Sequence, residues 1–239
     1  MILAKKSLSQ NFLVDKNISK KIINQVNIKN KIVLEIGPGH GFMTDDIINK
    51  KPKKMYLVEK DHNLVKGLKE KYKKNKKVII IEKDILQFKL TKFQNIIVIS
   101  NLPYNVGTKI ILYLFYFNKN ISEMIVMLQK EVALKFDYNL PNMNKYKFLA
   151  RIVSDFKICF NVSKNVFFPT PKVTSTIVKF KFNKKKVDLI KANKFSNLVF
   201  KNIRKKISNN LKINNKHYLL NKRVNQLSID ELLTIYDFF

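Results

Sequence analysis

The hydrophobic positions of the chain fall into short apolar runs that alternate with stretches of helical spacing. Apolar runs bounded by polar or glycine-rich turns are typical of strands buried on both faces of a parallel sheet. We expect strands at residues 32–36, 55–59, 78–81, 96–100 and 124–128. The spacing predicts helices at residues 43–49, 62–74 and 108–117, after Asp15, and from Lys130. Strands alternating with helices indicate an α/β domain with helices on both faces of its sheet.

The pattern changes toward the C-terminus. Residues 152–160 and 174–182 alternate enough to predict antiparallel strands added at the edge of the sheet. After Phe182 and a lysine-rich run, only helical spacing remains, at residues 189–200, 203–211 and 229–238. We therefore expect one domain over residues 1–183 and a small all-α domain over residues 184–239.

The charge narrows the choice of partners. The chain of 239 residues carries 47 Lys and Arg against 17 Asp and Glu, a net charge of +30. Such a chain attracts polyanions, with nucleic acid as the first choice and an acidic protein or a membrane surface as weaker alternatives. Only Arg151, Arg204 and Arg223 are arginines, so the coding bias of an AT-rich genome also accounts for part of the lysine excess.

Several classes of site and location are excluded. The single cysteine, Cys159, permits neither an internal disulfide nor a zinc site built on several thiolates, and the histidines show no metal spacing. We expect no metal. The sequence shows no secretory signal and no apolar stretch of membrane-spanning length. These features indicate a reducing, aqueous compartment, the cytoplasm.

A glycine-rich turn follows the first predicted strand. Gly37, Gly39 and Gly41 let the backbone pass close to a ligand and turn sharply into the next helix. Glu59 ends the next strand, where its carboxylate suits both hydroxyls of an adenosine ribose, and Asp84 ends the third, within reach of an adenine amino group. The sequence therefore predicts a nucleoside site at the carboxyl edge of the sheet.

The turn favours S-adenosylmethionine over NAD. Dinucleotide sites use G-x-G-x-x-G with a helix N-terminus at the pyrophosphate, whereas this turn reads G-x-G-x-G. Glu35, two residues before the first glycine, would repel a pyrophosphate but suits a ligand with a free ammonium group. A tight structural loop without a ligand is the alternative.

The tetrapeptide Asn101-Leu102-Pro103-Tyr104 directly follows the fourth strand. Two acceptors, the Asn101 side-chain oxygen and the Leu102 carbonyl, could bind both N–H groups of an exocyclic amine and direct its lone pair at an electrophile. Pro103 fixes the backbone, and Tyr104 offers a ring on which a base stacks, worth about 1–3 kcal/mol per base. Positioning and electrostatics would then suffice for methyl transfer to adenine N6. A plain turn is the alternative.

These motifs resemble the ribosomal RNA adenine N6,N6-dimethyltransferases, most closely the bacterial small-subunit enzymes. The resemblance covers nearly the whole chain and rests on residues 9–13, 35–39, 59, 84–85, 101–105, 127–133, 167–175, 200 and 204–205. It implies a Rossmann-like S-adenosylmethionine-dependent methyltransferase sheet with a small C-terminal all-α domain that binds RNA. It also implies methylation of two adjacent adenines near the 3′ end of small-subunit RNA, during maturation of that subunit.

The resemblance also assigns residues. Contacts to S-adenosylmethionine are implied for Asn11, Leu13, Gly37, Glu59, Asp84 and Asn101. Phe167 resembles the aromatic residue that closes on the second face of a flipped adenine, opposite Tyr104; a mere turn at the sheet edge is its alternative. In the helical domain, Arg204, Lys205 and Lys206 are the candidates for RNA contacts. The expected partner is small-subunit RNA or the immature small subunit, and the protein is expected to be a monomer.

The chain departs from the family pattern at two places, and two alternative functions remain. Residues 146–150 read Tyr-Lys-Phe-Leu-Ala where the family often has Tyr-Gly-x-Leu-Ser, and Ile203 takes the place of the first arginine in an Arg-Arg-Lys run. Both changes bear on RNA docking more than on cofactor binding. The alternatives are a large-subunit methylase of the macrolide-resistance type and an RNA-binding assembly or transcription factor without catalysis.

Overall fold

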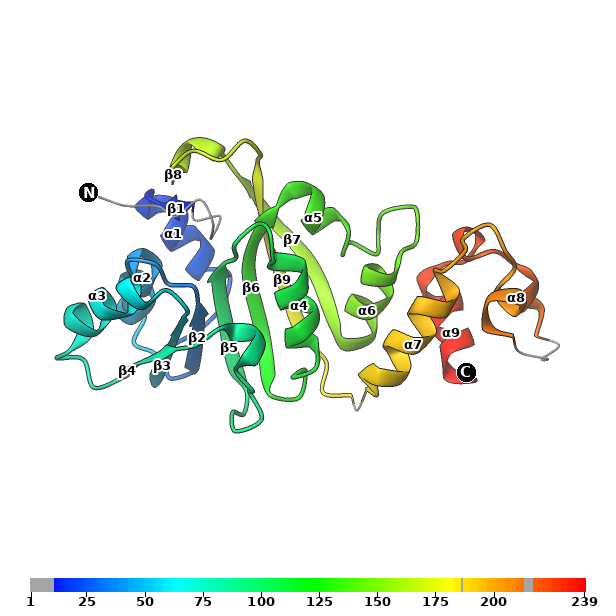
Figure 1. Ribbon diagram of the computed structural model, residues 1–239, viewed down its shortest axis with the longest axis horizontal. Coiled ribbons are helices and arrows are strands. Elements are labelled where there is room, and N and C mark those ends of the chain that lie inside the picture. Colours follow the sequence, from blue (N-terminus) through cyan, green and yellow to red (C-terminus); the bar gives the residue numbers. More distant parts are fainter. Residues whose placement is uncertain (1–10, 186, 213–216) are drawn as a thin grey trace.

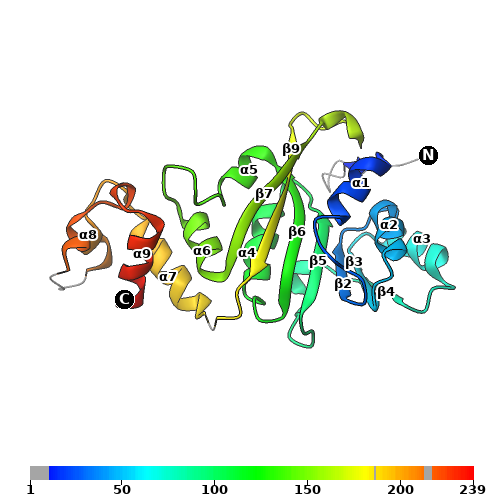
Figure 2. The same ribbon diagram turned by 180° about the vertical axis from the view of Figure 1, so that it is seen from behind.

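The computed structural model describes residues 11–185, 187–212 and 217–239. Residues 9 and 10, which open the motif at residues 9–13, lie outside the described residues. The molecule is elongated, with residues 62–72 toward one end and residues 207–211 toward the other (Figures 1 and 2).

A seven-stranded sheet forms the centre of the described chain, with the strand order β4-β3-β2-β5-β6-β9-β7. Its strands are β2 (Ile32–Ile36), β3 (Lys54–Glu59), β4 (Val78–Glu82), β5 (Ile96–Asn101), β6 (Ile121–Gln129), β7 (Ser154–Val162) and β9 (Ser175–Phe182). Strands β2 to β6 are parallel, while β9 runs antiparallel to both β6 and β7. The parallel arrangement brings the carboxyl ends of β2, β3, β4 and β5 to one edge.

Helices cover the sheet and fill the C-terminal region. They are α1 (Lys16–Ile23), α2 (Phe42–Asn49), α3 (His62–Tyr72), α4 (Gly107–Phe115), α5 (Lys130–Leu134), α6 (Lys145–Val153), α7 (Leu189–Val199), α8 (Ile207–Leu211) and α9 (Ile229–Asp237). Short 3-10 turns occur at Ile85–Gln87, Lys164–Val166, Tyr218–Asn221 and Val224–Gln226. Side chains from N-cap positions begin several helices, for example Asp15 at α1 and Ser228 at α9.

Successive residues of each central strand point into two different hydrophobic clusters, as expected for a sheet covered on both faces. In β5, Ile97 and Ile99 belong to the cluster that includes buried residues of α1 and α2, whereas Ile96 and Val98 belong to the cluster beneath α4. This explains why the strands read as uninterrupted apolar runs in the sequence.

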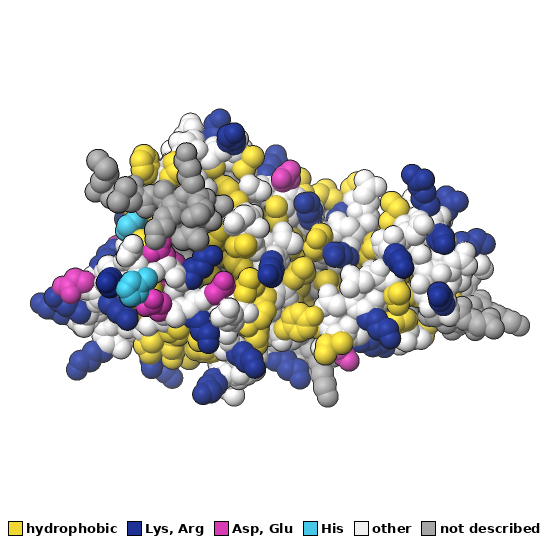
Figure 3. Space-filling model, viewed as in Figure 1, with side chains coloured by type: hydrophobic (Ala, Val, Ile, Leu, Met, Phe, Trp, Pro, Cys, Tyr) yellow, Lys and Arg dark blue, Asp and Glu magenta, His cyan; other side chains and the backbone are white. Residues whose placement is uncertain are grey.

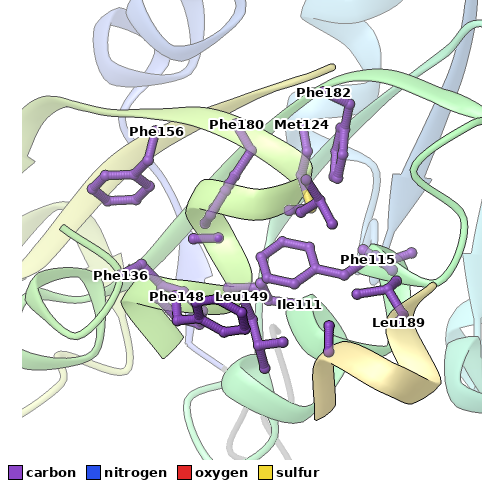
Figure 4. Packing of buried hydrophobic residues seen from close by; sticks show 14 of the residues in the cluster. Ile111, Phe115, Met124, Phe136, Phe148, Leu149, Phe156, Phe180, Phe182 and Leu189 are labelled. Atoms are coloured by element: carbon purple, nitrogen blue, oxygen red, sulfur yellow. The ribbon is translucent and has the colours of Figure 1, made fainter. Parts of the chain in front are cut away.

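The C-terminal helices share a hydrophobic core with the sheet. Phe148 of α6 lies 5.2 Å from Phe195 of α7 and 5.4 Å from Tyr236 of α9, measured between ring centroids. On the side nearer the sheet, Phe115 packs at 5.6 Å against Phe180 of β9 (Figure 4). One continuous cluster thus runs from β5 to α9. The predicted change from strands to helices near residue 184 is confirmed. The division into two domains stays a prediction.

A two-stranded ribbon joins distant parts of the chain beside the main sheet. Strand β1 (Phe12–Leu13) pairs antiparallel with β8 (Phe167–Phe168), with Leu13 opposite Phe167. The Val14 N–H also donates to the Val166 carbonyl at 2.9 Å. The ribbon places the N-terminal motif next to the segment that precedes β9 (Figure 1).

Three predictions about elements need correction. Residues 152 and 153 close helix α6, which the sequence did not predict, and β7 starts only at Ser154. Of the two added antiparallel strands, β9 lies inside the sheet between β6 and β7, and β7 is the one at the edge. Helix α8 starts only at Ile207, because residues 203–204 form a turn and Lys206 forms an isolated antiparallel bridge with Arg223.

The divergent residues 146–150 lie within α6. The Lys147 ammonium donates to the main-chain carbonyls of Leu140 and Pro141 at 2.7 and 2.6 Å, which holds the preceding loop against the helix. An effect of this change on RNA docking stays a prediction. Among the described residues, no helix is long and apolar enough to cross a bilayer.

Candidate active site

The glycine turn after β2 has the left-handed backbone that glycine permits. Gly37, Gly39 and Gly41 have φ angles of 61°, 58° and 77°. A side chain at Gly39 would place its Cβ 2.9 Å from Cε1 of Phe12, and one at Gly41 would collide with the Tyr72 hydroxyl. Gly37 has open space at its Cβ position instead. The turn therefore brings bare backbone to the edge of the sheet at Gly37.

Glu59 ends β3 next to this turn, and its carboxylate already accepts three main-chain hydrogen bonds. Oε1 accepts from the N–H groups of Lys60 and Asp61, each at 2.9 Å, and Oε2 accepts a longer bond from Gly39 at 3.4 Å. Burial raises the pKa of Glu59, and the three N–H donors oppose that rise. A carboxylate has about four acceptor positions, so Oε2 retains room for a ligand hydroxyl.

Asp84 lies after β4 and caps the 3-10 turn that follows. Its Oδ1 accepts from the Leu86 N–H at 2.9 Å, which orients the carboxylate. It lines a largely apolar cavity together with Ile36, Val58, Ile85 and Ile110. A largely apolar cavity with the Asp84 carboxylate in its wall suits a flat base that carries an amino group.

Two cavities meet at the carboxyl edge of the sheet. The first is lined by Asn11, Phe12, Gly37, Gly39, Glu59, Lys60, Leu64, Asn101, Leu102, Pro103 and Tyr104. The second, beside Asp84, shares Gly37, Glu59, Lys60 and Pro103 with it. Their empty volumes, including space open to solvent, are about 540 and 480 Å³.

Asn101 enters the first cavity from the end of β5, and the segment at β1 fixes its amide. The Asn101 Nδ2 donates to the main-chain carbonyl of Asn11 at 2.9 Å. Because a carbonyl can only accept, the amide nitrogen must face Asn11, and Oδ1 must point the other way. The side chain thus presents an acceptor to the remainder of the site.

Tyr104 stands at the same cavity, anchored at the far end of its ring. Its hydroxyl lies 2.6 Å from Oγ of Ser175, and either group can donate. Burial raises the pKa of Tyr104, so the phenol is neutral near pH 7. The ring is therefore available for stacking, without a charge.

Glu35 does not have the environment that the sequence suggested. Its side chain is 1% exposed and accepts a hydrogen bond from Oγ1 of Thr44 at 2.7 Å. Burial raises the pKa of Glu35 to about 8, so it is largely protonated at neutral pH. It lines neither cavity. The expectation that Glu35 pairs with a ligand ammonium is therefore wrong, because the group faces the protein interior and carries little charge.

Two other predicted site residues lie behind the cavity wall. Leu13 and Phe167, which face each other in the β1–β8 ribbon, are 4% and 3% exposed and belong to a hydrophobic cluster. Phe168, the next residue, is 53% exposed. A stacking role for Phe167 stays a prediction, and it would require the ring to leave this packing.

The predicted RNA contacts lie far from the cavities along the molecule. Arg204, Lys205 and Lys206 are all exposed, in the turns between α7 and α8. Lys and Arg side chains are scattered over the whole length of the visible face, whereas most visible acidic side chains gather toward the α2–α3 end (Figure 3). Charge alone therefore does not single out these three residues.

Some features of the site were not predicted from the sequence. Phe12 and Lys60 line the cavities, and Ser175 anchors Tyr104. Phe12 and Ser175 belong to the motifs at residues 9–13 and 167–175, and their place in these motifs could have indicated them from the sequence. Among the described residues, no cluster of three or more His, Cys, Asp or Glu could hold a metal ion.

Comparison with known proteins agrees with this geometry. The whole chain, residues 1–239, matches the family of ribosomal RNA adenine dimethylases. The chain belongs to this family.

Relatives within the family are similar along nearly their full length. Ribosomal RNA small subunit methyltransferase A of Mycoplasmopsis synoviae (strain 53) is 36% identical over 98% of this chain and 96% of its own. The protein of the same name from Hydrogenobaculum sp. (strain Y04AAS1) is 32% identical over 99% and 94%. The likeness thus extends through the C-terminal helices.

Solved structures establish the fold of this dimethylase-family chain. A dimethyladenosine transferase from Plasmodium falciparum superimposes with a TM-score of 0.79 at 20% identity, over 95% of this chain and 97% of its own. The 23S rRNA methyltransferase ErmE gives 0.74 at 18% identity, over 95% and 100%. The predicted Rossmann-like methyltransferase fold is confirmed, and the fold is shared by enzymes with different names.

Proposed function

We propose that this family member transfers methyl groups from S-adenosylmethionine to N6 of adenines in small-subunit ribosomal RNA, giving N6,N6-dimethyladenosine. One observation carries the proposal. Glu59, Asp84 and Asn101, from the ends of three different strands, converge on two adjoining cavities. The two carboxylates suit binding of a nucleoside, and Asn101 suits binding of the amine that receives the methyl group.

The cavities fit the parts of S-adenosylmethionine. The slot beside Asp84 suits the adenine, Glu59 suits the ribose, and the bare backbone at Gly37 allows close approach. Asn11, Leu13 and Asn101 complete the proposed cofactor contacts, with Leu13 limited to its main chain because its side chain is buried. When bound, the cofactor supplies a methyl group attached to a sulfonium sulfur. The sulfur is a good leaving group because it departs as a neutral thioether.

The chain activates the acceptor amine by orientation. Oδ1 of Asn101 and the Leu102 carbonyl accept the two N–H groups of adenine N6, which directs the nitrogen lone pair away from the ring. As the new C–N bond forms, the C–S bond to the methyl group breaks and the thioether leaves. The nitrogen then releases one proton to water. After the first transfer one N–H remains, so one acceptor can still hold the amine for the second. Catalysis then rests on positioning and on dipoles rather than on a strong base.

The base must leave its stack to reach this site. Tyr104 offers one face for stacking and Pro103 fixes the turn beneath it. Phe167 is proposed to close on the other face once the base enters. Stacking on an aromatic ring contributes about 1–3 kcal/mol per base.

The relatives' names favour small-subunit RNA as the substrate. The Mycoplasmopsis synoviae and Hydrogenobaculum proteins are both named small subunit methyltransferases. Arg204, Lys205 and Lys206 are proposed to bind RNA phosphates, in free RNA or in an immature small subunit. We further propose that the protein acts as a monomer in the cytoplasm, without a metal and away from membranes.

A large-subunit methylase is the second candidate, supported by the fold likeness to ErmE. Mass spectrometry of both ribosomal RNAs, from cells with and without this protein, separates the two. We expect dimethyladenosine to disappear from the small-subunit RNA alone. Its disappearance from the large-subunit RNA would overturn the choice of substrate, and no change in either would argue for a factor without catalysis.

A further inference from the structure

Ser175 is the first residue of β9, in the interior of the sheet. Its main chain pairs with Gln129 of β6 on one side and with Val162 of β7 on the other. The residue is 0% exposed. A side chain on a backbone held from both sides has little freedom to move.

The hydroxyl of Ser175 reaches across to the loop after β5. It lies 2.6 Å from the Tyr104 hydroxyl, 71 residues away in the chain. Tyr104 is thus held at two points, at its backbone by the turn containing Pro103 and at the tip of its ring by Ser175. A ring fixed at both ends cannot swing about its side-chain torsions.

We propose that Ser175 is a positioning residue that sets the plane of the Tyr104 ring for stacking on the target base. This inference rests on the proposed function, in which Tyr104 receives an adenine. Because N6 must align with both its acceptors and the methyl group, a small tilt of the stacked ring displaces the nitrogen. Misplacement of reacting atoms by about 1 Å can cost roughly a hundredfold in rate.

The contact acts by geometry rather than by proton transfer. Both partners are neutral hydroxyl groups near pH 7, because burial raises the pKa of Tyr104. Ser175 itself lines neither cavity, so it does not touch the base directly. Its effect must therefore pass through Tyr104, which makes the two residues a coupled pair.

A double-mutant cycle tests this coupling. Ser175→Ala and Tyr104→Phe each remove the same hydrogen bond and keep the aromatic ring. We expect each to lower the single-turnover methylation rate by about tenfold, within the range that aromatic stacking contributes. Because all three variants lack the same bond, the double variant should be no slower than either single variant. RNA affinity should stay within about twofold of wild type, since it rests on phosphate contacts.

Ser154→Ala is the matched control. Ser154 is also a fully buried serine at the start of a strand, and its Oγ donates to the Ala150 carbonyl at 2.9 Å. It lies outside both cavities. We expect its methylation rate to match wild type, which would separate positioning from a general loss of buried hydroxyl groups.

A second readout does not depend on methyl transfer. RNA with 2-aminopurine at the target position reports stacking by quenching, and Ser175→Ala should weaken that quenching as Tyr104→Phe does. Wild-type rates and quenching in Ser175→Ala, or additive losses in the double variant, would overturn the inference. If the wild-type protein methylates large-subunit RNA instead, the substrate proposal fails, and the same cycle run on that RNA still tests the pair.

Discussion

The side-chain amide of Asn101 is held by the main-chain carbonyl of Asn11, which lies 90 residues earlier, at an N–O distance of 2.9 Å. The contact joins the end of the central strand β5 to the segment that starts the β1–β8 ribbon. It leaves the amide only one orientation, with Oδ1 free to accept. The N-terminal segment therefore contributes to the acceptor site through its backbone.

Replacing Asn101 with Asp tests this orientation. Asp keeps an acceptor but cannot donate to the Asn11 carbonyl, so two oxygens would face each other. We expect Asn101→Asp and Asn101→Ala to lower the single-turnover rate alike, by about 100-fold, as for removal of a positioned transition-state hydrogen bond. RNA affinity should barely change. Asn120→Asp is the control, because Asn120 donates to the Phe93 carbonyl at 2.7 Å away from the cavities. A near-native rate in Asn101→Asp would show that the donor contact is dispensable.

Glu59 should dominate cofactor affinity. Glu59→Ala removes a proposed ribose contact and three main-chain bonds to the turn, so binding of S-adenosylmethionine should weaken by about 1.5–3 kcal/mol. Isothermal calorimetry measures the change. Glu82→Gln is the control, because Glu82 pairs with Glu59 in the ladder but is exposed and lines neither cavity. Tighter binding of NAD than of S-adenosylmethionine to the wild type would contradict the cofactor proposal.

Glu35 should make stability depend on pH. Its pKa rises from an ordinary 4.5 to about 8 on folding, so between these values the native state holds a proton that the unfolded state has released. The free energy of unfolding therefore falls as pH increases through this interval. Glu35→Gln mimics the protonated group, and its stability relative to wild type should increase from pH 5 to pH 8 in urea titrations. A constant difference across that range would show that Glu35 does not take up a proton on folding.

RNA binding should depend steeply on salt. Removing one phosphate contact reduces the slope of log affinity against log salt by about 1. Replacing Arg204, Lys205 and Lys206 with Gln should therefore reduce the slope by up to about 3. Lys66, Lys69 and Lys74 lie at the opposite, α3 end of the molecule, and the same change there provides the control (Figure 1). Equal reductions in both variants would mean that binding follows net charge rather than this site.

The parallel strands and the candidate nucleoside site were predictable because both leave local signals. A strand buried on both faces needs an uninterrupted apolar run. Glu59 directly follows one such run, and Asp84 lies three residues after Ile81, the last apolar residue of another. The strong N-caps Asp15 and Ser228 likewise mark helix starts from a few adjacent residues. These signals need no knowledge of distant contacts.

What the sequence did not predict depends on contacts between distant segments. Strand β1 has two residues and exists because it pairs with β8, more than 150 positions later. Helix α6 ends in Ile152 and Val153, whose branched side chains suggested a strand, yet packing against α7 and α9 stabilises the helix. The sequence assigned Glu35 to the ligand because it stands two residues before Gly37. Sequence position does not reveal where the side chain points, and in the structure it points into the protein interior.

The aromatic packing of Phe148 against Phe195 and Tyr236 fixes the distance between the two ends of the molecule. Rings interlocked in one core resist hinge bending, so the span from the Tyr104 pocket to the turn at Arg204 is set before any RNA arrives. Under the proposed function, an RNA engages both ends only if its reactive adenine lies at the matching separation from the phosphates that Arg204, Lys205 and Lys206 are proposed to bind. Rigid spacing would then select among RNAs that look alike in local sequence, rejecting those of the wrong length.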